Sequence, residues 1–342
     1  MAFSQLRFPR IDPVLSIVLM FALTQILAVW AGLSLLSAAK SDVNIQLINV
    51  APTGNSADPL NAVFFIAYIL FGAGAALFAI RFFKHKLTFR LLEVAVLLGS
   101  VSVFFFAVVY PLMGRDFTLS MGVASLLGVL FAASKFLIPS LKNPAAILSS
   151  AGVGAMFGFS LSFWPALLFV MAISLYDYIA VFRTRHMLVL AQSLGSKDLA
   201  FTITAQAPAQ ENQIPVAKEP AKTPREKKTN TASSRPPASA WAGSNPYAVP
   251  SLRPPSPAMH PAHCAVDRLD LGSGDLAIPA MLAVSAYSLA GLPGSVAVAV
   301  GSTISIYVLL HFVVKNRVVL PALPPICLGG LLALLAVLIA GA

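Results

Sequence analysis

Two aspartates stand inside long apolar stretches of this sequence, where an ionisable side chain is costly. Asp275 ends the motif Gly272-Ser273-Gly274-Asp275, and Asp177 lies in an earlier apolar run. An Asp at the centre of a membrane-spanning helix costs roughly 2.5 to 3.5 kcal/mol, so such a residue usually has a function. Two carboxylates held close together in a low-dielectric site cannot both ionise easily and share a proton. One can then take a proton from water while the other donates one to a carbonyl oxygen, which is general acid and base hydrolysis.

The composition is that of a polytopic membrane protein. Of the 342 residues, 58% are hydrophobic and 11% are charged, whereas soluble domains carry about 25% charged residues. The net charge of +10 comes from basic residues in short loops beside apolar runs and in one Pro-rich segment. We therefore expect a lipid bilayer and no nucleic acid as the partner. Cys264 and Cys327 lie far apart and indicate neither a disulfide framework nor a thiolate metal site, so we expect no metal and no cofactor.

Nine apolar runs are long enough to cross a membrane, which takes about 20 residues. The sequence therefore predicts an all-α polytopic membrane protein with nine transmembrane helices, at 14–37, 60–80, 91–112, 117–138, 144–162, 164–182, 269–290, 294–314 and 319–341. Of the 23 Lys and Arg residues, all except Lys40 and Arg115 fall on one side of this arrangement. Because Lys and Arg mark cytoplasmic loops, we expect a cytoplasmic N-terminus, an extracytoplasmic C-terminus and a multi-pass location in the cell membrane.

A long insert divides these helices six and three. Residues 1–182 hold the first six, and 183–206 mix charged and apolar residues, which favours a cytoplasmic interfacial extension of the sixth helix. Residues 207–266 include 12 of the chain's 25 prolines and are predicted to be a disordered Pro-rich cytoplasmic linker. Residues 267–342 hold helices seven to nine.

Apart from Asp270 at the very start of the seventh span, three acidic residues fall inside the predicted spans. Glu93 lies close to a basic cytoplasmic loop and is expected to be interfacial and solvated. Asp177 lies six residues before Arg183, and Asp275 lies seven residues after Arg268. At 1.5 Å per helical residue, both aspartates are about 9 to 10 Å below the same membrane face. Antiparallel neighbouring helices can therefore bring the two carboxylates side by side.

The residues around the two aspartates fit hydrolysis of a peptide. Gly272 and Gly274 weaken a helix by up to about 1 kcal/mol each relative to Ala, and they let another backbone come close. An unwound substrate could pair there as an added strand in a protein-lined, wet cavity. Tyr176 precedes Asp177 and could hydrogen-bond within the site. The ninth span opens with Pro321-Ala322-Leu323 on the same cytoplasmic side, where prolines prevent a regular helical start.

Three motifs in order resemble one family. Tyr176-Asp177, Gly272-Ser273-Gly274-Asp275 and Pro321-Ala322-Leu323, on the sixth, seventh and ninth spans, resemble the presenilin and signal peptide peptidase family of Gly-x-Gly-Asp intramembrane aspartyl proteases. The resemblance covers nearly the whole chain except the linker. It implies that Asp177 and Asp275 are the catalytic pair and that the Pro-Ala-Leu segment shapes the active site and contacts substrate. The implied substrates are single-span membrane proteins or signal peptides, cut within the membrane.

The sequence combines features of the two branches of this family. The expected cytoplasmic N-terminus is similar to that of presenilins, whereas Ile278-Pro279 resembles signal peptide peptidases. This mixture, together with Arg185-His186-Met187, resembles the archaeal presenilin homologues. Animal presenilins are cleaved for activation in the loop before the seventh helix, and residues 208–261 contain no recognisable equivalent of that site.

Two other functions remain open from the sequence. A prepilin or preflagellin peptidase is another membrane aspartyl protease with a Gly-x-Gly-Asp motif, although nine spans and the Pro-Ala-Leu segment argue against it. A proton-coupled transporter could use Asp177 and Asp275 as a relay, because paired intramembrane carboxylates also serve that purpose. The hydropathy pattern has no evident inverted repeat, which disfavours a transporter.

Overall fold

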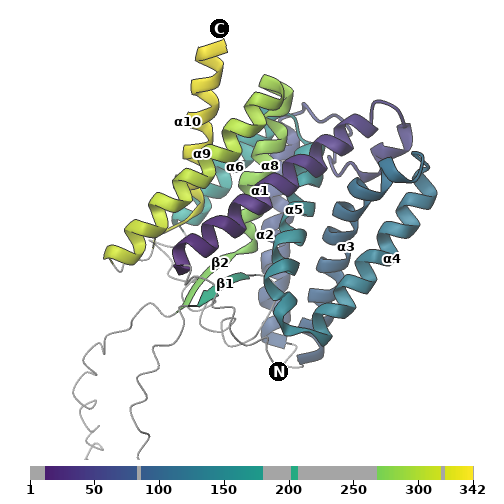
Figure 1. Cartoon of the computed structure of the whole chain (residues 1–342), viewed down its shortest axis with the longest axis horizontal. Helices are drawn as coiled ribbons and strands as arrows, with labels where there is room; N and C mark the ends of the chain where they lie inside the picture. Colours follow the sequence, from purple (N-terminus) through teal and green to yellow (C-terminus); the bar gives the residue numbers. More distant parts are fainter. Residues whose placement is uncertain (1–11, 83–85, 180–201, 207–267, 317–319, 342) are drawn as a thin grey trace, which may run out of the picture. The chain divides into compact units, whose positions relative to one another are not determined.

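The computed structural model describes residues 12–82, 86–179, 202–206, 268–316 and 320–341, which form helices and one two-stranded sheet (Figure 1). In chain order the elements are α1 (Pro13–Ala38), η1 (Val43–Ile48), α2 (Leu60–Phe82), α3 (Lys86–Leu112), α4 (Phe117–Leu137), η2 (Pro139–Leu141), α5 (Lys142–Ser160), α6 (Phe163–Ile179), β1 (Thr202–Gln206), β2 (Arg268–Gly272), α8 (Ser273–Ser285), α9 (Tyr287–Asn316) and α10 (Leu323–Gly341). The predicted linker at 207–266 and residues 183–201 of the predicted helical extension lie outside the described residues.

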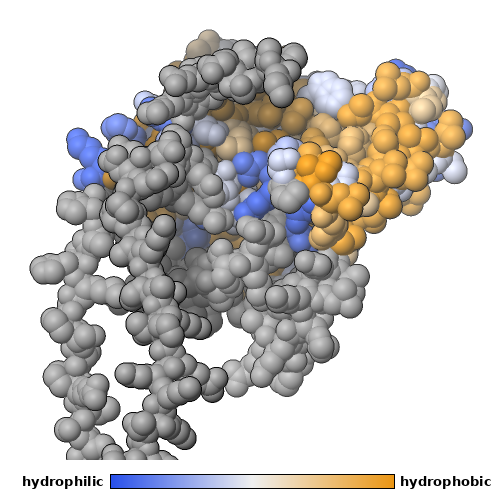
Figure 2. Space-filling model, turned by 60° about the horizontal axis from the view of Figure 1, so that its bottom comes forward, coloured by the Kyte–Doolittle hydropathy of each residue, from blue (hydrophilic) through white to orange (hydrophobic). Residues whose placement is uncertain are grey.

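The helices have the length and surface of membrane-spanning segments. Within the described residues, five are long and apolar enough to cross a membrane, namely α1, the part of α3 from Glu93, α4, α9 and α10. The helices α6 and α8 and the first part of α2 are shorter apolar helices. Large hydrophobic side chains are exposed along α4, including Leu126 and Leu130, and hydrophobic surface extends over the side where α3 and α4 lie (Figure 2). Such a surface needs a lipid environment, since soluble monomers rarely expose large apolar patches.

The segments flanking the long insert differ from the prediction. We expected helix through residue 206 and again from residue 269, but Thr202–Gln206 and Arg268–Gly272 are antiparallel strands, with Thr204 opposite Asp270. A strand needs a partner for its backbone groups, and the partner here is more than 60 residues away in the chain. The helical part of the seventh predicted span therefore begins only at Ser273, with α8.

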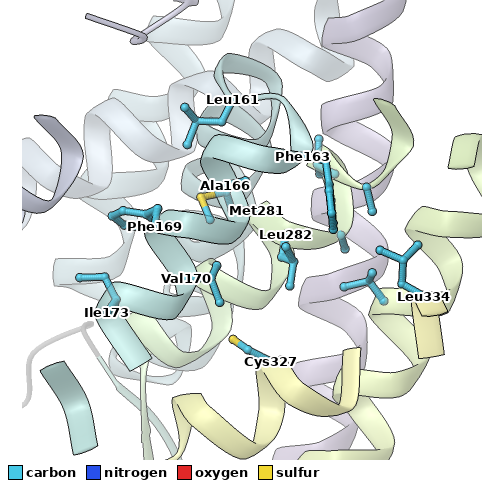
Figure 3. Packing of buried hydrophobic residues seen from close by; sticks show 14 of the residues in the cluster. Leu161, Phe163, Ala166, Phe169, Val170, Ile173, Met281, Leu282, Cys327 and Leu334 are labelled. Carbon is cyan, nitrogen blue, oxygen red and sulfur yellow. The ribbon is translucent and has the colours of Figure 1, made fainter. Parts of the chain in front are cut away.

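Helix α8 is short and lies among other helices. It contacts α1, α5, α6, α9 and α10, and a helix that is apolar on all sides belongs in such an interior. Its buried residues are Leu276, Ala277 and Pro279 to Ser285. Figure 3 shows the packing on one side, where Met281 and Leu282 of α8 lie near Val170 of α6 and Cys327 of α10.

Helices α5 and α8 approach so closely that two positions on α5 accommodate only glycine. A Cβ atom at Gly154 would lie 2.7 Å from Cβ of Ala280, and one at Gly158 would lie 2.5 Å from Cβ of Val284 and 2.8 Å from the carbonyl oxygen of Met281. Small residues four apart let two membrane helices pack backbone against backbone. The position of α8 is therefore tightly defined by α5.

The boundary between the seventh and eighth predicted spans lies at a local break. Ala290 (φ −132°) and Gly291 (φ 63°, ψ −154°) interrupt the helical segment that begins at Tyr287. A positive φ is readily adopted by glycine, which has no Cβ. The long helix that crosses the membrane therefore continues from this glycine toward Asn316.

The prediction for Glu93 is wrong. Its side chain is buried, with 1% of the residue exposed, and it forms an ion pair with Lys135 of α4, which is also buried. The sequence places Glu93 near a basic loop, but α4 packs against α3 and brings the lysine to it. A buried carboxylate needs such a partner, because an isolated charge in an apolar interior is very costly.

We predict that Lys135→Met lowers the free energy of unfolding by about 3 to 5 kcal/mol, because it removes the ammonium group that faces a buried carboxylate. The double variant Glu93→Gln/Lys135→Met should recover most of this loss, since it removes both charges. Unfolding in detergent micelles measures the effect, and Lys40→Met, at an exposed position, is the control. Equal losses in the single and double variants would contradict an ion-pair role.

Candidate active site

The sheet and α8 meet at the Gly272-Ser273-Gly274-Asp275 motif. Gly272 is the last residue of β2 and the N-cap of α8, so Asp275 is the third residue of the helix. The carboxylate of Asp275 accepts a hydrogen bond from the backbone N–H of Gly272. This is one half of a capping box, in which an acidic side chain reaches back to the N-cap N–H. The N-terminal end of the helix dipole also favours a negative charge at this position.

Asp177 lies near the end of α6 and contacts the start of another helix. Its carboxylate accepts a hydrogen bond from the backbone N–H of Leu323, the first residue of α10. The first N–H groups of a helix have no partner within the helix. In α10 the next two residues are Pro324 and Pro325, which have no N–H, and the N–H of Ile326 donates to the carbonyl of Ala322 (3.3 Å). The Pro-Ala-Leu segment therefore directs one unpaired backbone donor at Asp177.

The structure brings the two aspartates together. Their carboxylates are close enough for their charges to interact, and both side chains are partly exposed. Each one accepts a backbone N–H at the start of a helix, so the structure offers donors to two neighbouring negative charges. Such a pair shares a proton more readily than it carries two full charges. Chemically, this arrangement can polarise one water molecule and donate one proton at the same time.

Cys327 lies on the buried side of the site. Its thiol is 2% exposed, is near Asp275, and forms a hydrogen bond with the side chain of Ser174, one turn before Asp177 on α6. It belongs to the apolar cluster between α6, α8 and α10 (Figure 3). The site therefore borders on tightly packed apolar side chains.

The other residues predicted for the site have different surroundings. Tyr176 is 44% exposed, so its ring lies at the surface of α6 beside Asp177. Pro321 is buried and Ala322 is partly buried, just before α10 begins. The carbonyl of Ser273 accepts a hydrogen bond from Ser150 of α5 (3.1 Å). Among the described residues, no three His, Cys, Asp or Glu side chains converge in a way that could hold a metal ion.

The two glycines of the motif differ in the space around them. A Cβ atom on Gly272 would lie 3.3 Å from Oδ2 of Asp275, closer than ordinary van der Waals contact. A Cβ atom on Gly274 would have no neighbour within 4 Å. The absence of a side chain at Gly272 therefore prevents a steric clash with the Asp275 carboxylate. The absence of one at Gly274 leaves open space next to Asp275.

The sheet has one covered edge. Asn143 of α5 binds both backbone groups of Thr204 in β1, accepting from its N–H (3.1 Å) and donating to its carbonyl (2.9 Å). The Thr204 hydroxyl donates to Asp270 of β2 (2.6 Å). The edge of β1 that faces away from β2 is therefore covered by Asn143 at this point. Sequence reasoning missed Asn143 and Ser150, because nothing local distinguishes them from other polar residues near a helix.

Comparison with solved structures shows which fold this is. Two structures titled as a presenilin family intramembrane aspartate protease, in C222 and P2 space groups, align with TM-scores of 0.60 at 22% sequence identity. The alignments cover 96% and 97% of this chain and all of the solved chains. The fold is therefore that of a presenilin-type intramembrane protease. No curated protein matches the sequence significantly.

Comparison of the sequence with protein families leads to the same family as the fold. Residues 18–342 match the family described as "Signal-peptide peptidase, presenilin aspartyl protease". The chain belongs to this family, and it is an intramembrane aspartyl protease, a hydrolase. The resemblance inferred from the three motifs is confirmed, and the prepilin-type and transporter alternatives are set aside.

The two glycines support a prediction about activity. Gly272 has φ −67° and ψ 145°, which alanine also adopts, so Gly272→Ala should fold normally but crowd Asp275. We expect its kcat for a single-span substrate to fall about tenfold, a loss typical of a small misplacement of a reacting group.

Gly274→Ala is the matched control. It has no neighbour to crowd, and it should raise the free energy of unfolding by up to about 1 kcal/mol because alanine is the better helix former. Its kcat should be nearly unchanged, with any loss appearing in KM. Equal kcat values for Gly272→Ala and wild type would contradict the steric argument.

Proposed function

We propose that Asp177 and Asp275 are the catalytic pair and that the enzyme cuts peptide bonds within transmembrane segments of single-span membrane proteins or within signal peptides. The observation that carries this proposal is the meeting of the two carboxylates, each of which accepts a backbone N–H at the start of a helix. Membership of the family supports the reaction class.

The proposed reaction uses one water molecule and no covalent intermediate. The ionised aspartate takes a proton from water as the water oxygen bonds to the carbonyl carbon, and the protonated aspartate donates its proton to the carbonyl oxygen. The tetrahedral intermediate then loses its C–N bond, and the leaving nitrogen takes a proton from the pair. The two aspartates titrate as a unit, so the proton belongs to the pair at rest.

The substrate must lose its helical structure at the cut site, because a helix shields its peptide bonds. We propose that the unwound segment pairs with the edge of β2 that faces away from β1, since Asn143 covers β1 at Thr204. Added strands of this kind bind through backbone hydrogen bonds and tolerate many side chains. The space beside Gly274 suits the approach of a second backbone. We further propose that Tyr176 and the Pro321-Ala322-Leu323 segment contact the substrate.

The proposed topology has nine spans, with a cytoplasmic N-terminus, an extracytoplasmic C-terminus and a location in the cell membrane. It is supported by the distribution of Lys and Arg, only two of which lie on the outer side in this arrangement. The catalytic pair then lies near the cytoplasmic face, and the insert between α6 and α8 is cytoplasmic.

We predict that Asp177→Asn and Asp275→Asn each abolish cleavage of a single-span substrate by purified enzyme, because neither an amide nor a lone carboxylate can serve both proton transfers. Wild type should show a bell-shaped dependence of kcat/KM on pH, as expected of an acid and a base. The double variant Glu93→Gln/Lys135→Met is the matched control, since it removes a membrane carboxylate together with the lysine that pairs with it.

Retained cleavage in either Asn variant would overturn the paired mechanism. Mass spectrometry of the products should place the cut several residues inside the substrate's membrane segment. A cut beside the membrane would contradict the proposed substrate position, and inhibition by chelators would point to a metal.

We predict that a cysteine at Lys40, which is exposed after α1, reacts with a membrane-impermeant maleimide in intact cells. A cysteine at Ser140, exposed between α4 and α5, should react only after lysis. Both variants are made with Cys264→Ser, so that the remaining native cysteine is the buried Cys327. The reverse labelling pattern would contradict the proposed orientation.

A further inference from the structure

The first turn of α8, which carries Asp275, is only weakly stabilised by residues of its own helix. Gly274 precedes the aspartate, and glycine is the poorest helix former after proline. Pro279 lies four residues after Asp275, so the carbonyl of Asp275 has no N–H to accept from, and the proline ring crowds that carbonyl. The direction of the Asp275 side chain therefore depends on contacts from other helices.

Gln25 of α1 supplies one such contact. Its Nε2 donates to the carbonyl oxygen of Leu276, the residue after Asp275, over 3.2 Å. The side chain is deep in the protein, with 1% of the residue exposed. Its Oε1 has no hydrogen-bond partner among the described residues, and leaving a buried acceptor unsatisfied costs about 1 to 3 kcal/mol. An apolar residue of the same size would avoid this cost, so packing alone does not account for a glutamine here.

Ser150 of α5 supplies the second contact. Its hydroxyl donates to the carbonyl oxygen of Ser273 over 3.1 Å, and 2% of the residue is exposed. Ser150 lies one turn before Gly154, where α5 and α8 are in close contact. On the other side, a Cβ atom at Gly32 of α1 would lie 2.5 Å from Val284 of α8. Helix α8 is therefore held between α1 and α5 with little freedom to shift.

We propose that Gln25 and Ser150 are positioning residues that fix the turn carrying Asp275 so that its carboxylate faces Asp177. Their two hydrogen bonds come from different helices and hold carbonyls on either side of the aspartate, at residues 273 and 276. Both hydrogen bonds are to backbone carbonyls rather than to the reacting carboxylate. The inference rests on the proposed catalytic role of Asp275, and reacting groups need to be held by supporting hydrogen bonds within about 0.5 Å of their productive positions.

The test compares kcat, KM and thermal stability of the full-length enzyme in micelles. Gln25→Met replaces the amide by an apolar side chain of similar size, and Ser150→Ala removes one hydroxyl. Each variant should lower kcat about tenfold with KM changed less than twofold. Gln25→Met should unfold at the same temperature as wild type or higher, because it removes the buried acceptor that has no partner. The affinity for an aspartyl transition-state analogue should fall by the same factor as kcat.

Each variant has a matched control on its own helix. The Thr24 hydroxyl donates to Met20 within α1 (2.9 Å), and the Ser149 hydroxyl donates to Ala146 within α5 (3.2 Å). Both residues are buried and adjacent to the proposed positioning residues. Thr24→Val and Ser149→Ala should keep kcat within twofold of wild type.

The outcomes separate this proposal from the proposed function. Wild-type kcat in both Gln25→Met and Ser150→Ala, with the Asn variants of Asp177 and Asp275 inactive, would overturn the positioning role alone. A kcat loss that follows a fall in unfolding temperature in both variants would show a structural role and would also overturn it. Cleavage retained in the Asn variants would overturn the proposed function instead.

Discussion

Two carboxylates lie close together in an otherwise apolar part of the protein, and the rest of the structure depends on how this arrangement is accommodated. Each carboxylate accepts a backbone N–H at the start of a helix, Leu323 for Asp177 and Gly272 for Asp275. Both helix N-termini favour a negative charge without supplying a full positive one. A lysine or arginine beside the pair would hold both aspartates ionised, whereas partial charges leave room for a shared proton.

The third membrane carboxylate has the opposite arrangement. Glu93 is buried against the ammonium group of Lys135, so that α3 and α4 are joined by a full ion pair. Such a pair keeps its charges and suits a structural connection rather than proton transfer. These three membrane carboxylates are thus accommodated in two ways, and the difference follows from the group beside each one: a cation for Glu93, and helix N-termini for Asp177 and Asp275.

The change from strand to helix at Gly272 brings two kinds of backbone hydrogen-bonding group to the site. A strand presents an edge of backbone groups and a helix start presents N–H donors, and β2 and α8 place both within a few residues. This short helix, with a glycine in its first turn and a proline inside, would be poorly defined alone. Close packing against α1 and α5, through Gly32, Gly154 and Gly158, gives it a single position.

The sequence alone indicated a helical membrane protein and its family, and it predicted the two aspartates of the site, because hydrophobic length and short motifs are local properties of the chain. It placed Asp275 beside Asp177 by counting helical residues from Arg268, although residues 268–272 are a strand, which rises about twice as much per residue. The tertiary structure alone decided that 202–206 pairs with that strand, that Glu93 meets Lys135, and that Gln25 reaches Leu276. These contacts join residues 42 to 251 positions apart, and no local pattern of residue types specifies which distant backbone group a polar side chain will meet.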